Sequence, residues 1–238
     1  MATPVKEFQG QIATYFRQLT LATAYLEIGS GQLAKAPGNA SVALKLADDV
    51  TTEPMQLGEL LPHSNAVAVG IAELFQTKTI AAWSDLLNKL FAHFVTAHLD
   101  GIKSFPELKS RSTRIDFSVN SDIDSQIREG LVADFAFEKY SDRVKVVNRV
   151  LNPKGVHEDE LSIVKKHVLV RNSIQHHGSS VYTDMLKELG SNHIVLLDRE
   201  GKATNLSVGE PIQLFVPELD HLKGALFRVT NTWSAHFA

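Results

Sequence analysis

The sequence predicts a mainly α-helical protein, a helical bundle with a small β-hairpin element near its C-terminus. Long stretches carry apolar residues three and four positions apart, which is the spacing of one face of a helix. Near the C-terminus, residues 193–216 contain short apolar runs around a turn, a pattern typical of strands. The 238 residues include no cysteine, so the fold is expected to depend on packing alone.

Composition and charge restrict the classes of function. The chain is 44% hydrophobic and 21% charged, which favours a globular protein with one or at most two domains. Its net charge of -3 differs from that of strongly basic nucleic-acid-binding domains, so any RNA contact is expected to be local. The N-terminus lacks a signal-peptide pattern, and the longest apolar stretch, residues 66–75, is too short to span a bilayer. We therefore expect a cytoplasmic protein without a membrane partner.

The first third of the chain predicts one helix followed by a loop-rich segment. Apolar residues recur at helical spacing from Val5 to Ile28, and the pattern ends at residues 29–31, Gly-Ser-Gly. Residues 31–63 contain many prolines and glycines among Asn, Ser and Thr, which favours a loop with short ordered pieces. We treat residues 1–81 as an N-terminal helical and loop extension that packs on a bundle domain formed by residues 82–238.

Two helices are expected next, over residues 66–75 and 82–102, and the apolar stripe of the second is broad enough for burial on more than one side. Residues 105–120 are expected to be a connection. A long helix then begins at Ser121, which two acidic residues follow, and ends at residues 152–155, Asn-Pro-Lys-Gly. Its apolar residues have the spacing of a surface packed between helices: Phe137, Tyr140, Val144, Val147 and Leu151.

The C-terminal part predicts two more helices around the β element. A helix with an acidic first turn is expected over residues 157–177, forming an antiparallel hairpin with the helix before it. Residues 193–198 and 211–216 are predicted to be strands around a turn at residues 199–202. Pro217 then starts a last helix. Its apolar side is expected to comprise Leu219, Leu222, Leu226, Val229 and Trp233.

The helix over residues 157–177 carries the candidate site. Its inward stripe begins with Leu161, Val164 and Val168, and helical spacing continues this stripe onto polar residues, namely Asn172, Gln175 and His176. An unpaired buried polar group costs roughly 1 to 3 kcal/mol, so these residues are expected to face a cleft or another subunit. Arg171 lies about 140° from His176 around an ideal helix. Its long side chain must therefore swing, or it must meet a histidine from a second chain.

The segment HVLVRNSIQHHGS, with Arg171, Asn172 and His176, resembles the RNxxxH signature of the HEPN superfamily. The resemblance extends from about residue 82 to the C-terminus: a long first helix, a helix pair that ends in the motif, a short β segment and a closing helix. It is similar to the arrangement of RNA-cleaving HEPN families from toxin and phage-defence systems. The residues before 82 have no counterpart in it.

The resemblance implies a metal-independent endoribonuclease without a cofactor, built as a homodimer whose two motif helices line one composite cleft. His176 would accept the 2′-hydroxyl proton or donate a proton to the leaving 5′-oxygen. Arg171 would stabilise charge on the scissile phosphate, and Asn172 would orient His176 or shape the motif backbone. The substrate would be RNA, the product a 2′,3′-cyclic phosphate end, and DNA would be spared because it lacks the nucleophile.

The resemblance also implies a role as a toxin or phage-defence effector, and it leaves an antitoxin or a regulatory protein open as a partner. HEPN toxins that pair with a small nucleotidyltransferase antitoxin usually carry a tyrosine two residues after the motif histidine. This chain has Gly178 there. Control by nucleotidylation at that position is therefore not predicted.

Other interpretations stay open. His177, next to the motif, is a second candidate for the base. The alternative function is a non-catalytic helical module that binds nucleotides or a partner protein through the same cleft. The basic run at residues 109–114, KSRSTR, is a weaker candidate for contact with an RNA backbone. The other histidines lack compact metal-ligand spacing, so no metal is expected.

Overall fold

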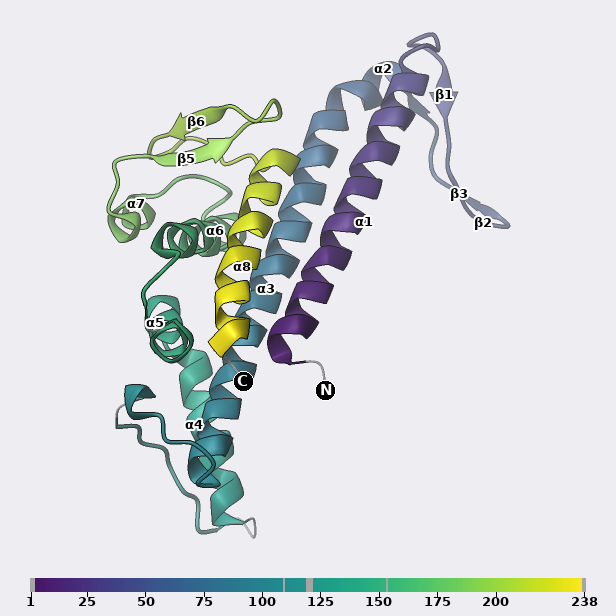
Figure 1. The fold of residues 1–238 in the computed structure, drawn as a ribbon. Helices are drawn as coiled ribbons and strands as arrows, with labels where there is room; N and C mark the ends of the chain where they lie inside the picture. The colour runs from purple at the N-terminus through teal and green to yellow at the C-terminus, as the bar shows by residue number, and fades with distance from the viewer. Residues whose placement is uncertain (1–2, 109, 119–121, 153, 237–238) are drawn as a thin grey trace.

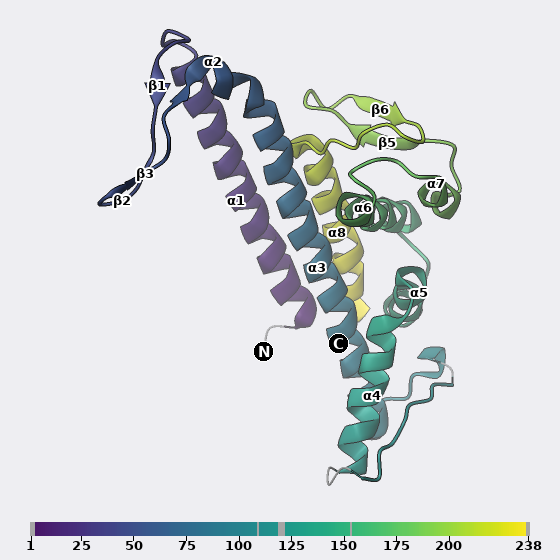
Figure 2. The ribbon, with the colours of Figure 1, turned by 180° about the vertical axis from the view of Figure 1, so that it is seen from behind.

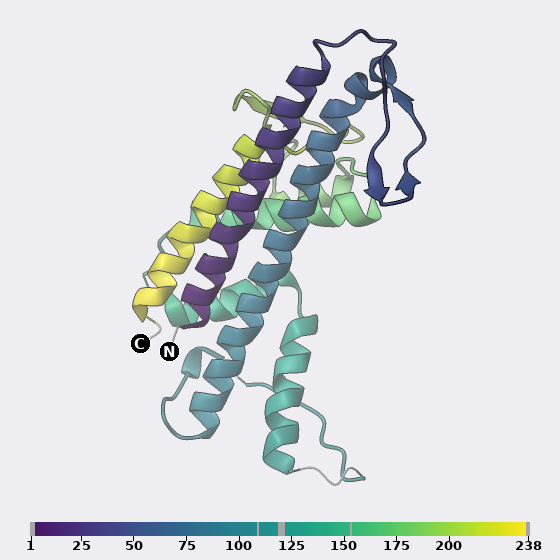
Figure 3. The same ribbon diagram turned by 90° about the vertical axis from the view of Figure 1, so that its right-hand side faces the viewer.

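A computed structural model describes residues 3–108, 110–118, 122–152 and 154–236. The fold is mainly α-helical with small two-stranded sheets, as the sequence predicts. Three long helices form its body: α1 (Pro4–Leu33), α3 (Ser64–Leu99) and α8 (Val216–His236). They lie side by side (Figures 1 and 3), and every pair among them is in contact. Within the described residues, no helix is both long and apolar enough to cross a bilayer.

The core between these three helices is aromatic at its centre. The rings of Trp83 and Trp233 stack with their centroids 5.0 Å apart, and Phe8 lies 5.8 Å from Trp83. Both tryptophans are fully buried. All five apolar residues predicted for the inner side of the last helix are buried as well: Leu219, Leu222, Leu226, Val229 and Trp233. The helical spacing therefore identified the buried face of α8.

The two helices expected over residues 66–75 and 82–102 are one continuous helix, α3, which corrects the prediction. The residues between them include neither Gly nor Pro, so nothing ends the helix there. The intervening Gln76, Thr79 and Ile80 are buried. The end at Leu99 precedes Gly101, whose backbone is left-handed with φ 70°. The boundary proposed after residue 81 falls within α3, and α1 packs directly on α3 and α8.

The segment after α1 is a loop with short ordered pieces, as predicted. Strand β1 (Ser41–Val42) pairs with β4 (Met55–Gln56), and β2 (Lys45–Ala47) pairs with β3 (Val50–Thr51). The short helices α2 (Leu57–Leu60) and η1 (Leu61–His63) lead into α3. The ribbon of strands extends away from the long helices (Figure 1). Helix α1 continues beyond the predicted end at Gly29, because Gly is tolerated within a helix at a cost of only about 1 kcal/mol.

The long helix predicted from Ser121 to residue 152 is two helices, α4 (Ile123–Phe137) and α5 (Tyr140–Leu151), preceded in the connection by the short η2 (Pro106–Leu108). Ser121 and Pro153 lie outside the described residues. The backbone of Glu138 is extended, with φ -64° and ψ 157°, and this ends α4. Phe137, predicted to be packed, is 93% exposed. Its place in the core is taken by Phe135, whose ring stacks on Phe91 at 4.0 Å.

Helices α5 and α6 (Glu158–His176), predicted to form an antiparallel hairpin, follow one another in the chain but have little contact with each other. Figures 1 and 2 show both on the same side of the long helices, with their axes across them. Each packs on α3 and α8. The short helix α7 (Thr183–Leu189), which the sequence reading missed, follows α6 and buries Met185 and Leu186.

The C-terminal β element is an antiparallel hairpin of β5 (Ile194–Leu197) and β6 (Ala203–Leu206), with the turn where it was predicted. The second strand is not at residues 211–216, which corrects the prediction. That segment makes a single bridge, from Pro211 to Ser180, and buries Ile212 and Leu214 against the core. The apolar residues of this segment are buried, but the segment does not pair as a strand. The partner of β5 is β6, which is largely exposed.

Candidate functional site

The buried face of α6 differs from the predicted stripe. Most of its buried residues are three positions apart, namely Leu161, Val164, His167, Val170 and Ser173, and Leu169 is buried beside them. Steps of three instead of 3.6 turn the buried face gradually around the helix. As a result Val168 and Asn172 are only half-buried at the edge of this face, and His176 is exposed. Gln175 is exposed as well, so neither Gln175 nor His176 lies on the buried face within one chain, and their expected contact with another subunit stays a prediction.

A hydrogen bond fixes the end of α6. The hydroxyl of Ser173 is buried and donates to the carbonyl oxygen of Ser180 at 2.6 Å. The amide of His177 donates to the carbonyl of Ser173 at 2.8 Å, and Gly178 follows with φ 61°. The left-handed glycine lets the chain turn back immediately after the helix. The motif helix therefore ends in a fixed position.

Arg171 and Asn172 line a groove between α3, α5 and α6, which we call the motif groove. Its volume is about 440 Å³, and its polar lining includes Ser84, Asn88, Tyr140, Arg143, Arg171 and Asn172. Arg171 donates from Nη1 to Oδ1 of Asn172 at 3.3 Å. A second hollow of about 530 Å³ adjoins it, shares Tyr140 and Asn172, and adds Lys139 and Lys165. Two of the three predicted site residues thus lie in one polar groove.

The motif groove contains a second arginine, Arg143, that the sequence reading missed. Arg143 is only 7% exposed. Its guanidinium donates to Oγ of Ser84 at 3.0 Å, to the carbonyl of Ser84 at 2.8 Å and to Oδ1 of Asn88 at 2.8 Å. It also lies over the ring of Phe135, 5.4 Å from the centroid. The sequence does contain an indication of Arg143. It follows Tyr140 by three residues and so lies on the apolar face predicted for that helix, where a charged residue is unexpected.

The third predicted residue, His176, is not in the motif groove. Within the part of the chain described, its exposed side chain makes no hydrogen bond or ion pair with Arg171 or Asn172. The alternative base, His177, is also exposed, and its ring stacks on Tyr182 with a centroid distance of 4.0 Å. One copy of the chain therefore brings Arg171 and Asn172 together and leaves both imidazoles outside.

Below α6 lies a buried ionic cluster that the sequence reading also missed. Oε1 of Glu218 is 2.9 Å from Nε2 of His167 and 2.6 Å from Nζ of Lys166. Its other oxygen accepts the backbone amide of Leu197 at 2.7 Å. The side chains of Glu218 and His167 are fully buried. One carboxylate therefore joins α6, α8 and the β hairpin.

The pKa values of this cluster predict acid lability. Burial alone would raise the pKa of Glu218, but the hydrogen bond from His167 and the charge of Lys166 outweigh it and lower this pKa to about 2. Burial also lowers the pKa of His167 below 6.5. The unfolded chain therefore binds more protons than the folded chain, first as the pH falls below about 6.5 and then from about 4.5 toward 2.

We expect the melting temperature to fall as the pH is lowered through these two ranges, in thermal melts between about pH 7.5 and pH 3. The matched variant is Glu218→Gln, which lacks the titrating carboxylate and should show a shallower decline below about pH 4.5 than the original chain. Parallel pH profiles for the two proteins would contradict this assignment.

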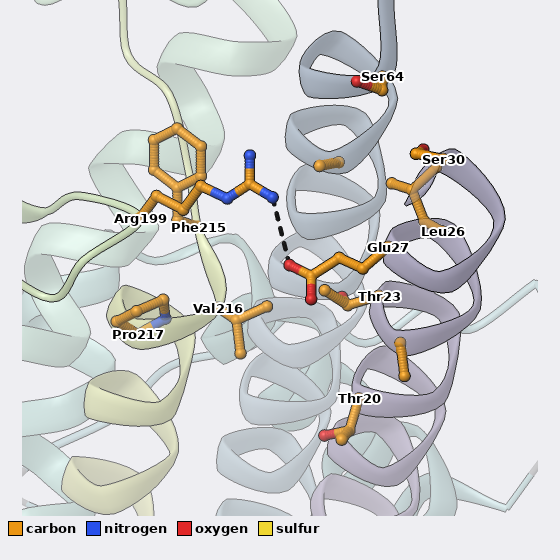
Figure 4. Close-up of a pocket in the computed structure, with 12 residues that line it drawn as sticks. Thr20, Thr23, Leu26, Glu27, Ser30, Ser64, Arg199, Phe215, Val216 and Pro217 are labelled. Carbon is orange, nitrogen blue, oxygen red and sulfur yellow. Dashed lines mark hydrogen bonds and ion pairs between the residues drawn. The ribbon is translucent and has the colours of Figure 1, made fainter. Parts of the chain in front are cut away.

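A larger cavity of about 650 Å³ lies between α1, α3 and the start of α8 (Figure 4). Thr20, Thr23, Ser30 and Ser64 are among its lining residues, and the exposed pair of Arg199 and Glu27, 3.2 Å apart, spans it. No buried charge faces it, and none of the predicted site residues lines it. The ion pair between Arg199 and Glu27 in this cavity is exposed, whereas the motif groove holds a buried cation. We therefore prefer the motif groove as the candidate site.

The other predicted candidates for RNA or metal binding do not form a second site among the described residues. In the basic run at 109–114, Lys109 lies outside the described residues, and Arg111 pairs with Glu138 and lies over the ring of Phe91. Among the described residues, no group of three or more His, Asp or Glu side chains is placed to hold a metal ion. No known protein family, curated protein or solved structure matches this chain.

Proposed function

We propose that this chain is a metal-independent endoribonuclease of the HEPN type, which acts as a homodimer. The observation that carries the proposal is that the arginine and asparagine of its RNxxxH motif line a polar groove beside a second, buried arginine. Arginine matches the geometry of a phosphate oxygen pair with its forked donors. A groove with two guanidinium groups suits a phosphodiester better than it suits a neutral or cationic ligand.

The residue types fit cleavage by attack of the 2′-hydroxyl. His176 accepts the hydroxyl proton or donates a proton to the leaving 5′-oxygen, the role that histidine commonly has as a general acid or base. Arg171 stabilises the negative charge that builds on the phosphate, and Asn172 holds the Arg171 side chain through its amide oxygen. The bond between phosphorus and the 5′-oxygen breaks, and the product strand ends in a 2′,3′-cyclic phosphate.

A second copy completes the site in this proposal. In one chain His176 is exposed at the end of α6, whereas Arg171 lies in the groove. Approach of the α6 ends of two copies around a twofold axis lets His176 of one copy reach the phosphate held by the other. The two histidines then divide the roles of base and acid.

We place the enzyme in the cytoplasm as a toxin or phage-defence effector, with an antitoxin or another regulatory protein as the partner that restrains it. The motif resemblance supports this role. A ribonuclease without a metal or cofactor requirement needs such control, because its substrate is present throughout the cell.

Cleavage assays test the function. Purified protein is expected to cut structured RNA in the presence of EDTA and to leave 2′,3′-cyclic phosphate ends, detected by mass spectrometry of the fragments. The same sequence with 2′-deoxy residues should remain intact, because it lacks the nucleophile. Cleavage that requires a divalent metal, or equal cleavage of the deoxy strand, would contradict the mechanism.

The alternative is a non-catalytic module that binds nucleotides or a partner protein through the motif groove. It is favoured by one observation, the separation of His176 from Arg171 within a single chain. Nucleotide binding measured by calorimetry, together with intact RNA under all conditions of the cleavage assay, would support this alternative over the nuclease.

A further inference from the structure

We propose that the motif groove is a binding subsite for an internucleotide phosphate of RNA, with Arg143 as its buried cation and Arg171 as its outer cation. The inference rests on the proposed function in taking RNA as the ligand, but it concerns binding and not cleavage. It assigns a role to a residue outside the motif.

Arg143 is buried without a negatively charged partner. Three of the five N–H donors of its guanidinium reach neutral acceptors on Ser84 and Asn88. Its Nε is buried without an acceptor, and Arg143 forms no ion pair with any described carboxylate. Burial of a charge is costly unless it is paired. An anion in the groove would supply the missing negative charge.

The charges around the groove favour an anion. Among the described residues Arg171 donates to the neutral amide of Asn172. The adjoining hollow adds two cations, Lys139 and Lys165, and one carboxylate, Glu188. The acidic residue on the lining, Asp85, pairs with Lys89 at 2.9 Å. Glu138, whose charge acts on Arg143 from a distance, pairs with Arg111. Both carboxylates are therefore already neutralised by other cations.

The pKa of Arg143 agrees with this arrangement. Burial lowers this pKa, and the nearby Tyr140 and Glu138 compensate only in part. Burial also raises the pKa of Tyr140, so its hydroxyl stays protonated and adds no negative charge to the groove. A bound phosphate would offset the effect of burial on Arg143.

The ligand in this proposal is a phosphate within an RNA strand. Tyr140 lines both the groove and the adjoining hollow, and its hydroxyl accepts a hydrogen bond from Nε1 of the buried Trp83 at 3.2 Å. This bond ties the Tyr140 hydroxyl to the wall of the groove. The groove and its adjoining hollow share Tyr140, Val168 and Asn172, so a backbone could pass from one to the other.

Binding of a labelled 2′-O-methyl RNA oligonucleotide, which cannot be cleaved by 2′-hydroxyl attack, tests the subsite by fluorescence anisotropy at several salt concentrations. Arg143→Met is expected to weaken binding about tenfold. It should also lower the magnitude of the slope of log affinity against log salt by about 0.7, the value for one phosphate contact on a single strand. The matched control is Arg149→Met, the same change at an exposed position of the same helix, which should leave binding within about twofold.

The outcomes separate this subsite from the nuclease. Affinity and salt slope unchanged by Arg143→Met, or no RNA binding by the original chain, overturn the subsite even where cleavage of ordinary RNA is observed. The expected loss of binding with no cleavage of ordinary RNA supports the subsite and contradicts the nuclease. If Arg143→Met does not fold, Arg143→Lys keeps the charge but not the fork, and it should bind severalfold more weakly with an unchanged salt slope. Unchanged affinity of that variant also overturns the subsite.

Discussion

Replacement of His176 by alanine is expected to reduce the rate of RNA cleavage by about a hundredfold to ten-thousandfold, the usual contribution of a general acid or base. The side chain is exposed and makes no contact with the groove of its own chain, so its loss should leave the fold intact. The melting temperature should therefore stay within about 2 °C of the original value. Initial rates of cleavage of an end-labelled RNA, measured in EDTA, give the ratio directly.

The matched control is His177→Ala, the same change at the adjacent position. His177 stacks on Tyr182, and this contact explains its presence without a catalytic role. We expect this variant to retain most of the cleavage activity. The reverse order, with His177→Ala inactive and His176→Ala active, would contradict the assignment of the base.

Replacement of Glu218 by alanine is expected to be the most destabilising of the changes proposed here, by about 3 to 5 kcal/mol, because it removes one partner from a buried ionic cluster. His167 and Lys166 would lose their carboxylate, and the amide of Leu197 would lose its acceptor. For a chain of this length, that loss corresponds to a fall in melting temperature on the order of 10 °C. Urea unfolding followed by circular dichroism measures the free energy of unfolding.

Asp220→Ala provides the control on the same helix. Asp220 is exposed and pairs with Lys223 at 3.1 Å, so its removal should cost less than about 0.5 kcal/mol. Similar losses of stability for Asp220→Ala and Glu218→Ala would contradict the role given to the cluster.

The sequence predicts the helices whose apolar residues keep one spacing from end to end. In α8, Pro217 marks the start and the inner residues through Trp233 are all buried. The extent of α3 could not be predicted in the same way. Its central residues Gln76 and Thr79 are polar but buried, because Gln76 donates to the carbonyl of His167 and Thr79 to that of Phe75. Such buried polar residues, each of which donates a hydrogen bond to a backbone carbonyl, interrupt an apolar pattern without ending a helix.

The break between α4 and α5 was unpredictable for a different reason. Phe135 and Phe137 are equally apolar, so the sequence does not show which of them is buried. In the tertiary structure Phe135 packs on Phe91, whereas Phe137 faces solvent. In the same way, residues 211–216 have the apolar composition of a strand, but they pack as an extended segment against the core. An apolar pattern in the sequence indicates that a segment is buried, but it does not indicate which element the segment packs against.

For the candidate site, the motif located Arg171 and Asn172, which line one groove. His176 follows the predicted stripe in sequence but is exposed within one chain, since most buried residues of α6 advance in steps of three. Arg143 and Glu218 come from α5 and α8, so their convergence on α3 and α6 depends on tertiary structure alone. Each is weakly indicated in the sequence: Arg143 is a charged residue on a predicted apolar face, and Glu218 is a charged residue in the first turn of a predicted helix.

The specific activity of the chain, measured as a function of its concentration, tests most directly whether two copies complete the site. We predict that cleavage per chain in EDTA rises with protein concentration over the range in which mass photometry shows dimers forming. A monomer that cleaves RNA at the full rate per chain, or a dimer that leaves RNA intact, would contradict the account.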